Sequence, residues 1–169
     1  NFSIEMKLVA DSGSTKTQWC LLNGKQVIKE IFTDGINPFY QTEEEIQGQI
    51  REQLLPELAF SEFSEIYFYG AGCAFPDKKM MVENAIRWAF PSAKIEVNND
   101  LLAACRALFG DKPGIACILG TGSNSCLYDG KDIIENISPL GFILGDEGSG
   151  AAIGKRFIAD LLKHQYPEE

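Results

Sequence analysis

Short apolar runs alternate with polar turns at the beginning of the chain. Leu8–Ala10 has the pattern of a short buried strand that ends at Asp11. Gln18–Leu22 and Gln26–Phe32 have the pattern of two further strands. Asn23-Gly24 lies between them, and this pair is a strong hairpin signal because both residues tolerate a positive φ. The pattern therefore predicts three consecutive strands joined by tight turns.

Helical signals follow this run of strands. Thr42 and Glu45 have the spacing of a capping box and open a helix to about Leu55, with an acidic start that suits the helix dipole. The next elements that we expect are a strand at Ile66–Tyr69, a helix from Pro76 to about Phe90, a strand at Ile95–Val97 and a helix at Asp100–Phe109. This βββαβαβα order predicts an α/β fold with a mixed sheet and helices on its faces.

The later residues repeat the pattern of the first ones. Gly114–Leu119 is an apolar strand that ends in a glycine-rich turn, as Leu8–Ala10 does. The matching segments beyond the turns are Cys20-Leu-Leu-Asn-Gly-Lys25 and Cys126-Leu-Tyr-Asp-Gly-Lys131, followed by the apolar pairs Val27-Ile28 and Ile133-Ile134. Such a repeat predicts two related domains, 6–111 and 112–169, of which the second is incomplete and reaches only a helix beginning near Gly148. Chance similarity over so short a match is the alternative.

Composition and charge narrow the class of protein. The chain has 169 residues, of which 45% are hydrophobic and 23% charged, as in an ordinary globular domain. Its net charge of −9 argues against nucleic acid or an anionic membrane as the main partner. Apolar runs stay well below the roughly 18 residues of a transmembrane helix. Residues 1–5, ahead of Met6, are too polar and too few for a signal peptide and are interpreted as a cloning remnant or a disordered segment.

The cysteines indicate a reducing compartment. There are five, at 20, 73, 105, 117 and 126, and most lie within apolar runs. No CxxC pair occurs among them. We therefore expect reduced core residues of a cytosolic protein.

Two glycine-rich turns follow apolar strands, but neither matches a common nucleotide motif. The phosphate loop G-x-x-x-x-G-K-[ST] needs Lys after its second glycine, whereas Ser14 follows Gly13. The dinucleotide motif G-x-G-x-x-G needs a third glycine, and Gly120-Thr-Gly122 is followed by Ser123-Asn-Ser125. Both motifs open helices, whereas strands continue here. The turns are therefore predicted to be hairpin tips.

Hairpin tips of this composition can still bind phosphate. Small residues let successive backbone N–H groups approach phosphate oxygens. Thr15, Thr121 and Ser123 add hydroxyl donors, and Lys16 adds a positive charge. Asp11 at the strand end is suited to hold Mg²⁺ through water, because hard cations prefer oxygen ligands. The alternative is two ordinary turns, one of which Asp11 merely caps.

Four motifs together resemble one family. "DSGSTKT" and "LGTGSN" look like the two phosphate motifs of the actin-like, sugar-kinase and Hsp70-type ATPase superfamily, whose fold is ribonuclease H-like. With "NND" at 98–100 and "GDEGSG" at 145–150, the chain resembles the BadF/BadG/BcrA/BcrD ATPase family, and within it the N-acetylglucosamine and glucosamine kinases. The resemblance extends from Lys7 to about His164.

The resemblance implies an ATP site and a catalytic base. ATP would lie between the two domains, with its phosphates bound by Asp11, Gly13, Ser14, Thr15, Lys16, Gly120, Thr121, Gly122 and Ser123. The family's general base matches Asp100, a role that suits a carboxylate able to orient a sugar hydroxyl and accept its proton. A simple N-cap of the following helix is the alternative for Asp100. The family's adenine-binding segment lies beyond this chain, so the fragment alone is expected to be inactive.

The resemblance also implies sugar contacts. Asn37, Gly72 and Asp146 match residues of the family's sugar site, whose substrate would be N-acetylglucosamine or glucosamine. Asn37 precedes a proline, so an ordinary turn is its alternative. Glu147 is interpreted as a dipole partner of the following helix, and the single histidine, His164, as a solvated helix residue outside the site.

Two rival functions stay open. Some family members are ATPase activators of dehydratases or reductases, which carry an Fe–S cluster at a homodimer interface. Cluster ligands would be cysteines in loops near helix termini, and here only Cys73 lies in a predicted loop. A non-enzymatic sensor of the same fold is the second rival. Family members often dimerise, so the resemblance also implies a homodimer.

Overall fold

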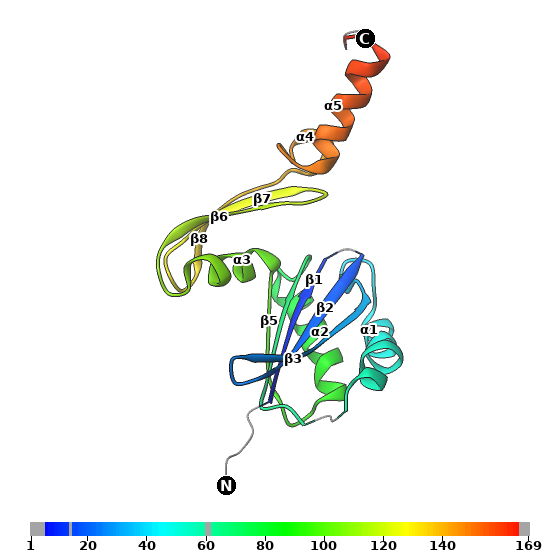
Figure 1. The fold of residues 1–169 in the computed structure, drawn as a ribbon, viewed down its shortest axis with the longest axis vertical. Coiled ribbons are helices and arrows are strands. Elements are labelled where there is room, and N and C mark those ends of the chain that lie inside the picture. The colour runs from blue at the N-terminus through cyan, green and yellow to red at the C-terminus, as the bar shows by residue number, and fades with distance from the viewer. Residues whose placement is uncertain (1–5, 14, 60–61, 166–169) are drawn as a thin grey trace. The chain divides into compact units, whose positions relative to one another are not determined.

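The computed structural model describes residues 6–13, 15–59 and 62–165. The chain divides into two compact units, Asn1–Ala103 and Ala104–Glu169. This division falls upstream of the predicted boundary between residues 111 and 112, which remains a prediction. Residues 1–5, interpreted above as a cloning remnant or a disordered segment, lie outside the described residues. Figure 1 shows the elements of both units.

The first unit is built on a mixed sheet, as predicted. Its strands are β1 (Met6–Ser12), β2 (Lys16–Asn23), β3 (Gln26–Asp34), β4 (Glu65–Gly70) and β5 (Lys94–Asn98), in the spatial order β3-β2-β1-β4-β5. The first three strands pair antiparallel, whereas β4 runs parallel to β1 and β5 runs parallel to β4. Each strand includes the shorter segment predicted from the apolar pattern. Parallel β1, β4 and β5 therefore bring their carboxyl ends to one edge of the sheet.

The helices of this unit follow the predicted starts. They are α1 (Glu43–Gln49), which continues as a π-helical turn η1 (Ile50–Leu54) and a 3₁₀ turn η2 (Leu55–Glu57), then α2 (Pro76–Ala89) and the beginning of α3 (Asp100–Phe109), a helix that continues into the second unit after Ala103. The capping box is present: the Glu45 N–H donates to Thr42 Oγ1 at 3.3 Å, and the Thr42 N–H donates to Glu45 Oε2 at 2.7 Å. None of the helices in the described part of the chain is both long and apolar enough to cross a bilayer.

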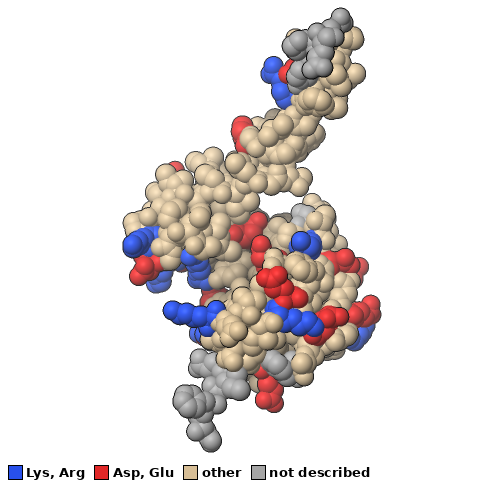
Figure 2. Space-filling model, in the orientation of Figure 1, with Lys and Arg blue, Asp and Glu red and all other residues tan. Residues whose placement is uncertain are grey.

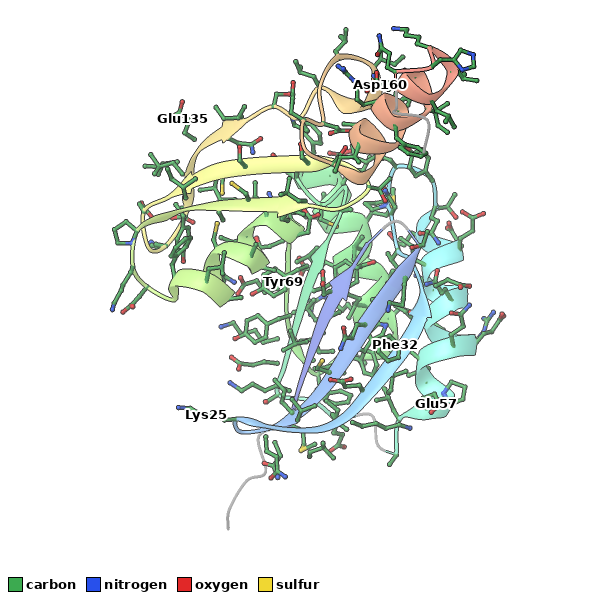
Figure 3. The ribbon with its side chains drawn as sticks, turned by 45° about the horizontal axis from the view of Figure 1, so that its top comes forward. Lys25, Phe32, Glu57, Tyr69, Glu135 and Asp160 are labelled. Atoms are coloured by element: carbon green, nitrogen blue, oxygen red, sulfur yellow. The ribbon has the colours of Figure 1, made fainter. Side chains whose placement is uncertain are left out.

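Strand alternation gives the sheet one apolar and one polar face. Leu8, Trp19 and Phe68 are buried in the core under the helices, and each buried side chain of this size contributes about 1.5–3 kcal/mol. On the other face, Asp11 lies opposite both Gln18 and Tyr69. Directly paired residues share a face, so Asp11 belongs to a transverse polar row. Figure 3 shows Tyr69 and Phe32 along this sheet, with Lys25 at the hairpin between β2 and β3.

The second unit is a three-stranded antiparallel meander followed by two helices. Its elements are β6 (Gly114–Leu119), β7 (Ser123–Tyr128), β8 (Ile133–Ile137), α4 (Gly141–Leu144) and α5 (Gly150–Leu162). The short helix α4 was not predicted. Many apolar side chains of this unit are exposed, including Ile115, Leu119, Ile143 and Leu162. In the view of Figure 2, most of its visible atoms belong to uncharged residues.

The two meanders share a bulge. The pairing register shifts between Leu21 and Leu22 in β2 and between Leu127 and Tyr128 in β7, the positions that the sequence repeat equates. Each bulge is followed by a turn with a positive-φ glycine, Gly24 or Gly130. A β-bulge changes the local twist and is a specific feature of a strand pair, so this coincidence supports the predicted duplication, which stays a prediction.

Candidate phosphate and sugar site

Both glycine-rich turns are hairpin tips, as predicted. The first joins β1 to β2, where the Gly13 N–H donates to the Lys16 carbonyl at 2.9 Å. Thr15 and Lys16 are exposed, whereas Ser14 lies outside the described residues. The Lys16 ammonium lies 4.7 Å from the centroid of the Phe32 ring. The turn thus presents a hydroxyl and a positive charge at the end of the sheet.

Ser12 connects this turn to two neighbouring loops. Its buried Oγ accepts a hydrogen bond from the Ile36 N–H at 2.9 Å and lies 2.7 Å from Thr17 Oγ1. Its carbonyl accepts a hydrogen bond from the Ala71 N–H at 2.9 Å. Thr17 in turn donates to the Asp34 carbonyl at 3.0 Å. The first glycine-rich turn is therefore held in place by the same residue that anchors the loops carrying Asn37 and Gly72.

The structure brings Asn37 and Gly72 together. Asn37 Oδ1 accepts a hydrogen bond from the Phe39 N–H at 3.0 Å, which fixes the orientation of the amide. Gly72 has φ +84°, and a Cβ built on it would lie 2.6 Å from Asn37 Oδ1. Glycine is therefore required at 72 both for its backbone conformation and for the approach of Asn37. Among the described residues, Asn37 Nδ2 has no hydrogen-bond partner and can donate to a ligand.

Three glutamines hold the Asn37 loop: Gln41 just before α1, Gln49 at the end of α1 and Gln53 in η1. Gln41 Oε1 accepts from the Asn37 N–H at 2.7 Å, and Gln41 Nε2 donates to Gln49 Oε1 at 2.9 Å. Gln53 accepts from the Asp34 N–H and donates to its carboxylate, at 2.8 and 2.7 Å. Sequence reasoning missed these tethers. The sequence carried one signal for them: Gln49 and Gln53 are four residues apart, which puts both on one side of a helix.

Asp100 is the first residue of α3 but not its cap. Asn99 Oδ1 accepts from the Leu102 N–H at 2.9 Å, which is the N-cap contact. The alternative role considered for Asp100 is thus filled by its neighbour. The Asp100 carboxylate instead accepts from the Leu101 N–H at 2.9 Å.

The surroundings of Asp100 favour its protonated form. Burial raises the pKa of the Asp100 carboxyl, the Leu101 N–H opposes this rise, and the nearby charge of Asp11 adds to it. A carboxylate with a raised pKa is better matched to accepting a proton from a hydroxyl. Two neighbouring carboxylates are also a place where a bound cation would relieve repulsion.

The second glycine-rich turn rests on the start of α5. The Gly150 N–H donates to the Gly120 carbonyl at 2.8 Å, and the Ala151 N–H donates to the Thr121 carbonyl at 3.2 Å. The Gly120 N–H donates to the Gly122 carbonyl at 2.9 Å and closes the turn. These contacts fix the backbone of the turn, while Thr121 stays exposed.

Asp146 lies against this second turn. Its Oδ1 accepts from the Ser123 N–H at 3.2 Å, and a Cβ on Gly122 would lie 3.1 Å from each of its carboxylate oxygens. Asp146 itself has φ +60°. The structure thus places Asp146 within the second unit, with one oxygen ordering the glycine turn.

Two minor predictions are corrected near the end of the chain. Ser149 caps α5 by accepting from the Ala152 N–H at 3.1 Å, so Glu147 lies ahead of the cap and not in the first helical turn. His164 is exposed, but it lies in a turn just after α5, with φ +53°, and not in the helix.

The prediction that the cysteines are core residues holds for Cys73, Cys105 and Cys126, which are buried, and is wrong for Cys117, which is exposed, and for Cys20, which is half-buried. Cys20, Cys117 and Cys126 are on strands, Cys105 is on α3, and Cys73 is in the turn after β4. All five are free thiols, and burial raises the pKa of the Cys73 thiol to about 12.

A comparison with known protein families shows to which family the chain belongs. The model of the BadF/BadG/BcrA/BcrD ATPase family matches residues 10–164. The chain belongs to this family. Membership in the BadF/BadG/BcrA/BcrD ATPase family supports ATP as a ligand and agrees with the resemblance found in the motifs.

Relatives of this ATPase family include sugar kinases. The chain is 30% identical over 159 residues to the N-acetylmuramic acid/N-acetylglucosamine kinase of Clostridium acetobutylicum. The matched region covers 90% of this chain and 52% of the relative. It thus spans about half the length of that relative. A solved structure from Porphyromonas gingivalis, provisionally named an N-acetylglucosamine kinase, is 52% identical with a TM-score of 0.91, over 96% of this chain and 58% of that one.

The predicted fold class is confirmed. MreB5 of Spiroplasma citri bound to ADP superposes with a TM-score of 0.58 at 9% identity, over 79% of this chain and 51% of that chain. At this identity the likeness concerns the fold alone. Together with the mixed sheet and the sugar-kinase relatives, this likeness shows that the chain has the actin-like ATPase fold.

Proposed function

We propose that this chain supplies the phosphate turns, the base and sugar contacts of an ATP-dependent amino sugar kinase acting on N-acetylglucosamine or glucosamine. The observation that carries the proposal is Asp100, a carboxylate with a raised pKa that is not needed as a helix cap. The names of the relatives support the same substrate class. The roles below rest on the contacts of each unit taken separately.

In the proposed reaction, Asp100 orients a sugar hydroxyl and accepts its proton as the hydroxyl oxygen attacks the γ-phosphorus. The bond from that phosphorus to the bridging oxygen breaks, and ADP leaves. General-base catalysis of this kind contributes about 10²–10⁴-fold. The raised pKa makes the Asp100 carboxylate a stronger proton acceptor than an ordinary aspartate.

The two glycine turns are assigned to the phosphates of ATP. In the first, the exposed Thr15 hydroxyl and Lys16 ammonium would contact phosphate oxygens, with Gly13 allowing close approach. Ser14 belongs to the same proposal from its place in the motif. In the second turn, the segment Gly120–Ser123 would supply further backbone and hydroxyl donors.

Asp11 is assigned to Mg²⁺. Its exposed carboxylate lies one residue before the end of β1 and near the charge of Asp100, and hard oxygen donors of this kind fit a cation that keeps most of its waters. Within the described residues, no group of three or more His, Cys, Asp or Glu side chains forms a cation cage. Asp11 would therefore hold the ion through water, and the ion would neutralise phosphate charge when bound.

The sugar contacts are assigned to Asn37, Gly72 and Asp146. Asn37 Nδ2 is left to donate to a sugar hydroxyl because Oδ1 is used by Phe39. Gly72 is the close neighbour that lets Asn37 adopt this position. One carboxylate oxygen of Asp146, Oδ1, orders the second turn, and the other would accept a hydrogen bond from a sugar hydroxyl.

The test measures ADP release by the full-length protein with ATP and Mg²⁺, in the presence of glucosamine, N-acetylglucosamine, glucose or no sugar. Release that an amino sugar stimulates, and that falls about 10²-fold or more in Asp100→Asn, supports the proposal. Asp132→Asn, which alters an exposed carboxylate of the β7–β8 turn, is the matched control and should have no effect. Release that no sugar stimulates and Asp100→Asn leaves unchanged would point to an ATPase activator or a sensor instead.

A further inference from the structure

Asn98, the first residue of the motif at 98–100, has no part in the proposed function so far. It is the last residue of β5, the strand at one end of the five-stranded sheet. Asn98 pairs with Tyr69, which in turn pairs with Asp11, so Asn98 belongs to the same transverse polar row as Asp11. Its half-buried side chain thus marks the point where the chain leaves the sheet for α3, two residues before Asp100.

The Asn98 amide bridges a cation and an anion. Asn98 Oδ1 accepts a hydrogen bond from the Lys79 ammonium at 3.0 Å, and Asn98 Nδ2 donates to Glu96 Oε1 at 2.7 Å. Hydrogen bonds to charged partners are roughly twice as strong as those between neutral groups. A flipped amide would turn its NH₂ toward the ammonium and its oxygen toward the carboxylate. The two charges therefore fix the orientation of the Asn98 side chain and tie the end of β5 to α2.

This bridge lies near the proposed base and the proposed sugar contacts. Burial is the main cause of the raised pKa of the Cys73 thiol, the positive charge of Lys79 lowers that pKa, and the negative charge of Asp100 raises it. Both charged groups are therefore close enough to act on the same buried thiol, and Cys73 directly follows Gly72. The residue that holds Asn98 is thus in the neighbourhood of Asp100, within the first unit.

The short exit from β5 is held at both ends. Only Asn99 separates Asn98 from Asp100, and Asn99 Oδ1 accepts from the Leu102 N–H at 2.9 Å. The Asn98 amide therefore holds the strand side of this segment, and the Asn99 cap holds its helix side. A general base must lie within hydrogen-bond reach of the proton that it accepts, and a displacement of about 1 Å can lower a rate about 10²-fold.

We propose that Asn98 is a positioning residue for Asp100: its amide, held between Lys79 and Glu96, fixes the exit from β5 and with it the place of the Asp100 carboxylate. This inference rests on the proposed kinase function and adds to it the residues that hold the base in place. Asn98 acts through Asp100 and not by touching a substrate. Lys79 contributes by orienting Asn98.

The experiment measures single-turnover phosphoryl transfer by the full-length protein to whichever of N-acetylglucosamine and glucosamine the wild type phosphorylates faster. Asn98→Leu keeps the size of the side chain and removes both hydrogen bonds. The transfer rate should fall about tenfold or more, with dissociation constants for sugar and ATP within about twofold of wild type. Lys79→Met, which removes one of the two bonds, should lower the rate in the same way, and Lys79→Arg, which keeps a donor, should restore most of it. These two variants also decide the question if Asn98→Leu does not fold.

A double variant tests whether Asn98 acts through the base. Asn98→Leu combined with Asp100→Asn should be no slower than Asp100→Asn alone, because a positioning residue has nothing to contribute once its base is removed. Asn84→Leu is the matched control: the exposed Asn84 amide of α2 also donates to a glutamate, Glu43 Oε2, at 3.3 Å, but lies outside the bridge. It should leave the rate unchanged.

Hydrogen exchange of the ligand-free protein gives a readout that does not depend on activity. The Leu102 N–H should exchange roughly tenfold faster in Asn98→Leu, the scale of one weakened hydrogen bond. The Phe90 N–H, which donates to the Ile86 carbonyl at 3.0 Å at the end of α2, should not change.

A wild-type transfer rate in Asn98→Leu, or a loss that adds to that of Asp100→Asn, overturns the inference and leaves the kinase proposal standing. Wild-type transfer in Asp100→Asn, or no transfer to any amino sugar, overturns the proposed function instead. Exchange then decides the role of Asn98: faster exchange at Leu102 alone supports its hold on the start of α3, and unchanged exchange overturns it.

Discussion

The side-chain oxygen of Ser12 accepts a hydrogen bond from the Ile36 N–H at 2.9 Å, although 24 positions separate the two residues in the chain. Ser12 ends β1 just before the proposed phosphate turn, and Ile36 precedes the proposed sugar contact Asn37. The carbonyl of Ser12 also anchors the Ala71 N–H next to Gly72. A single buried residue thus sets the relative positions of the proposed phosphate and sugar loops.

Replacing Ser12 by alanine should weaken both loops at once. The buried Ile36 N–H would lose its acceptor, and an unsatisfied buried donor costs about 1–3 kcal/mol of unfolding free energy. Urea denaturation measures this loss, and steady-state kinetics should show a raised KM for both sugar and ATP. Ser92→Ala, at an exposed turn, is the control. Stability within about 0.5 kcal/mol of wild type, the range of ordinary surface changes, would contradict the proposed role.

Replacing Gly72 by alanine should affect the sugar and not ATP. The new Cβ would displace the Asn37 amide, so the KM for sugar should rise about tenfold or more, the cost of one misplaced hydrogen bond to substrate. Gly24→Ala provides a matched control, because Gly24 also has a positive φ, +58°, but no atom within 4 Å of its Cβ position. Both variants lose stability from backbone strain. An equal rise in sugar KM in the two variants would show that strain, and not Asn37, is responsible.

The pH profile of the reaction should report the raised pKa of Asp100. The base must be ionised, so kcat/KM should fall as the pH drops through that pKa, with a midpoint above the ordinary aspartate value of 3.8. Because the charge of Asp11 contributes to the rise, Asp11→Asn should lower the pKa of Asp100 in the protein without Mg²⁺, which an NMR titration measures. A kinetic midpoint at or below 3.8, or an Asp100 pKa that Asp11→Asn raises, would contradict this account of the site.

The raised pKa of Asp100 should also make the stability of the folded protein depend on pH. A carboxyl whose pKa is higher in the folded protein than in the unfolded chain binds its proton more tightly when folded. Stability is therefore lost as the pH rises from the unfolded pKa through the folded one. Asp100→Asn removes this penalty, so it should be more stable than wild type near neutral pH and lose that advantage in acid. Thermal melts at several pH values measure the difference, and a variant less stable at neutral pH would contradict it.

Local signals predicted much of the fold. The helix Asp100–Phe109 and the strand Gly114–Leu119 have the bounds expected from the sequence, because a cap or an apolar run marks both ends. The helix α4 at Gly141–Leu144 was missed, since it has four residues, no side-chain cap and no room for a periodic pattern. It begins after Leu140 at φ +56°, a backbone state that propensity does not predict for leucine.

The sequence predicted which residues belong to the candidate site, but not which of them contact one another. The motifs singled out Asn37, Gly72 and Asp100, but the contact between the first two depends on a long-range approach of two loops. Ser12 was overlooked for the same reason, because its partners are set by tertiary structure. Asn99, and not Asp100, caps α3. Adjacent Asn and Asp have similar cap propensities, and the path of the backbone after β5 decides between them.

The central claim is that Asp100 accepts the proton of a sugar hydroxyl during phosphoryl transfer. The most direct measurement is the single-turnover rate of transfer to N-acetylglucosamine or glucosamine at saturating ATP, Mg²⁺ and sugar, in wild type and Asp100→Asn. The account predicts a rate about 10²–10⁴-fold lower in the variant, with dissociation constants for sugar and ATP close to wild type. A variant that binds both ligands and transfers phosphate at the wild-type rate would contradict the claim.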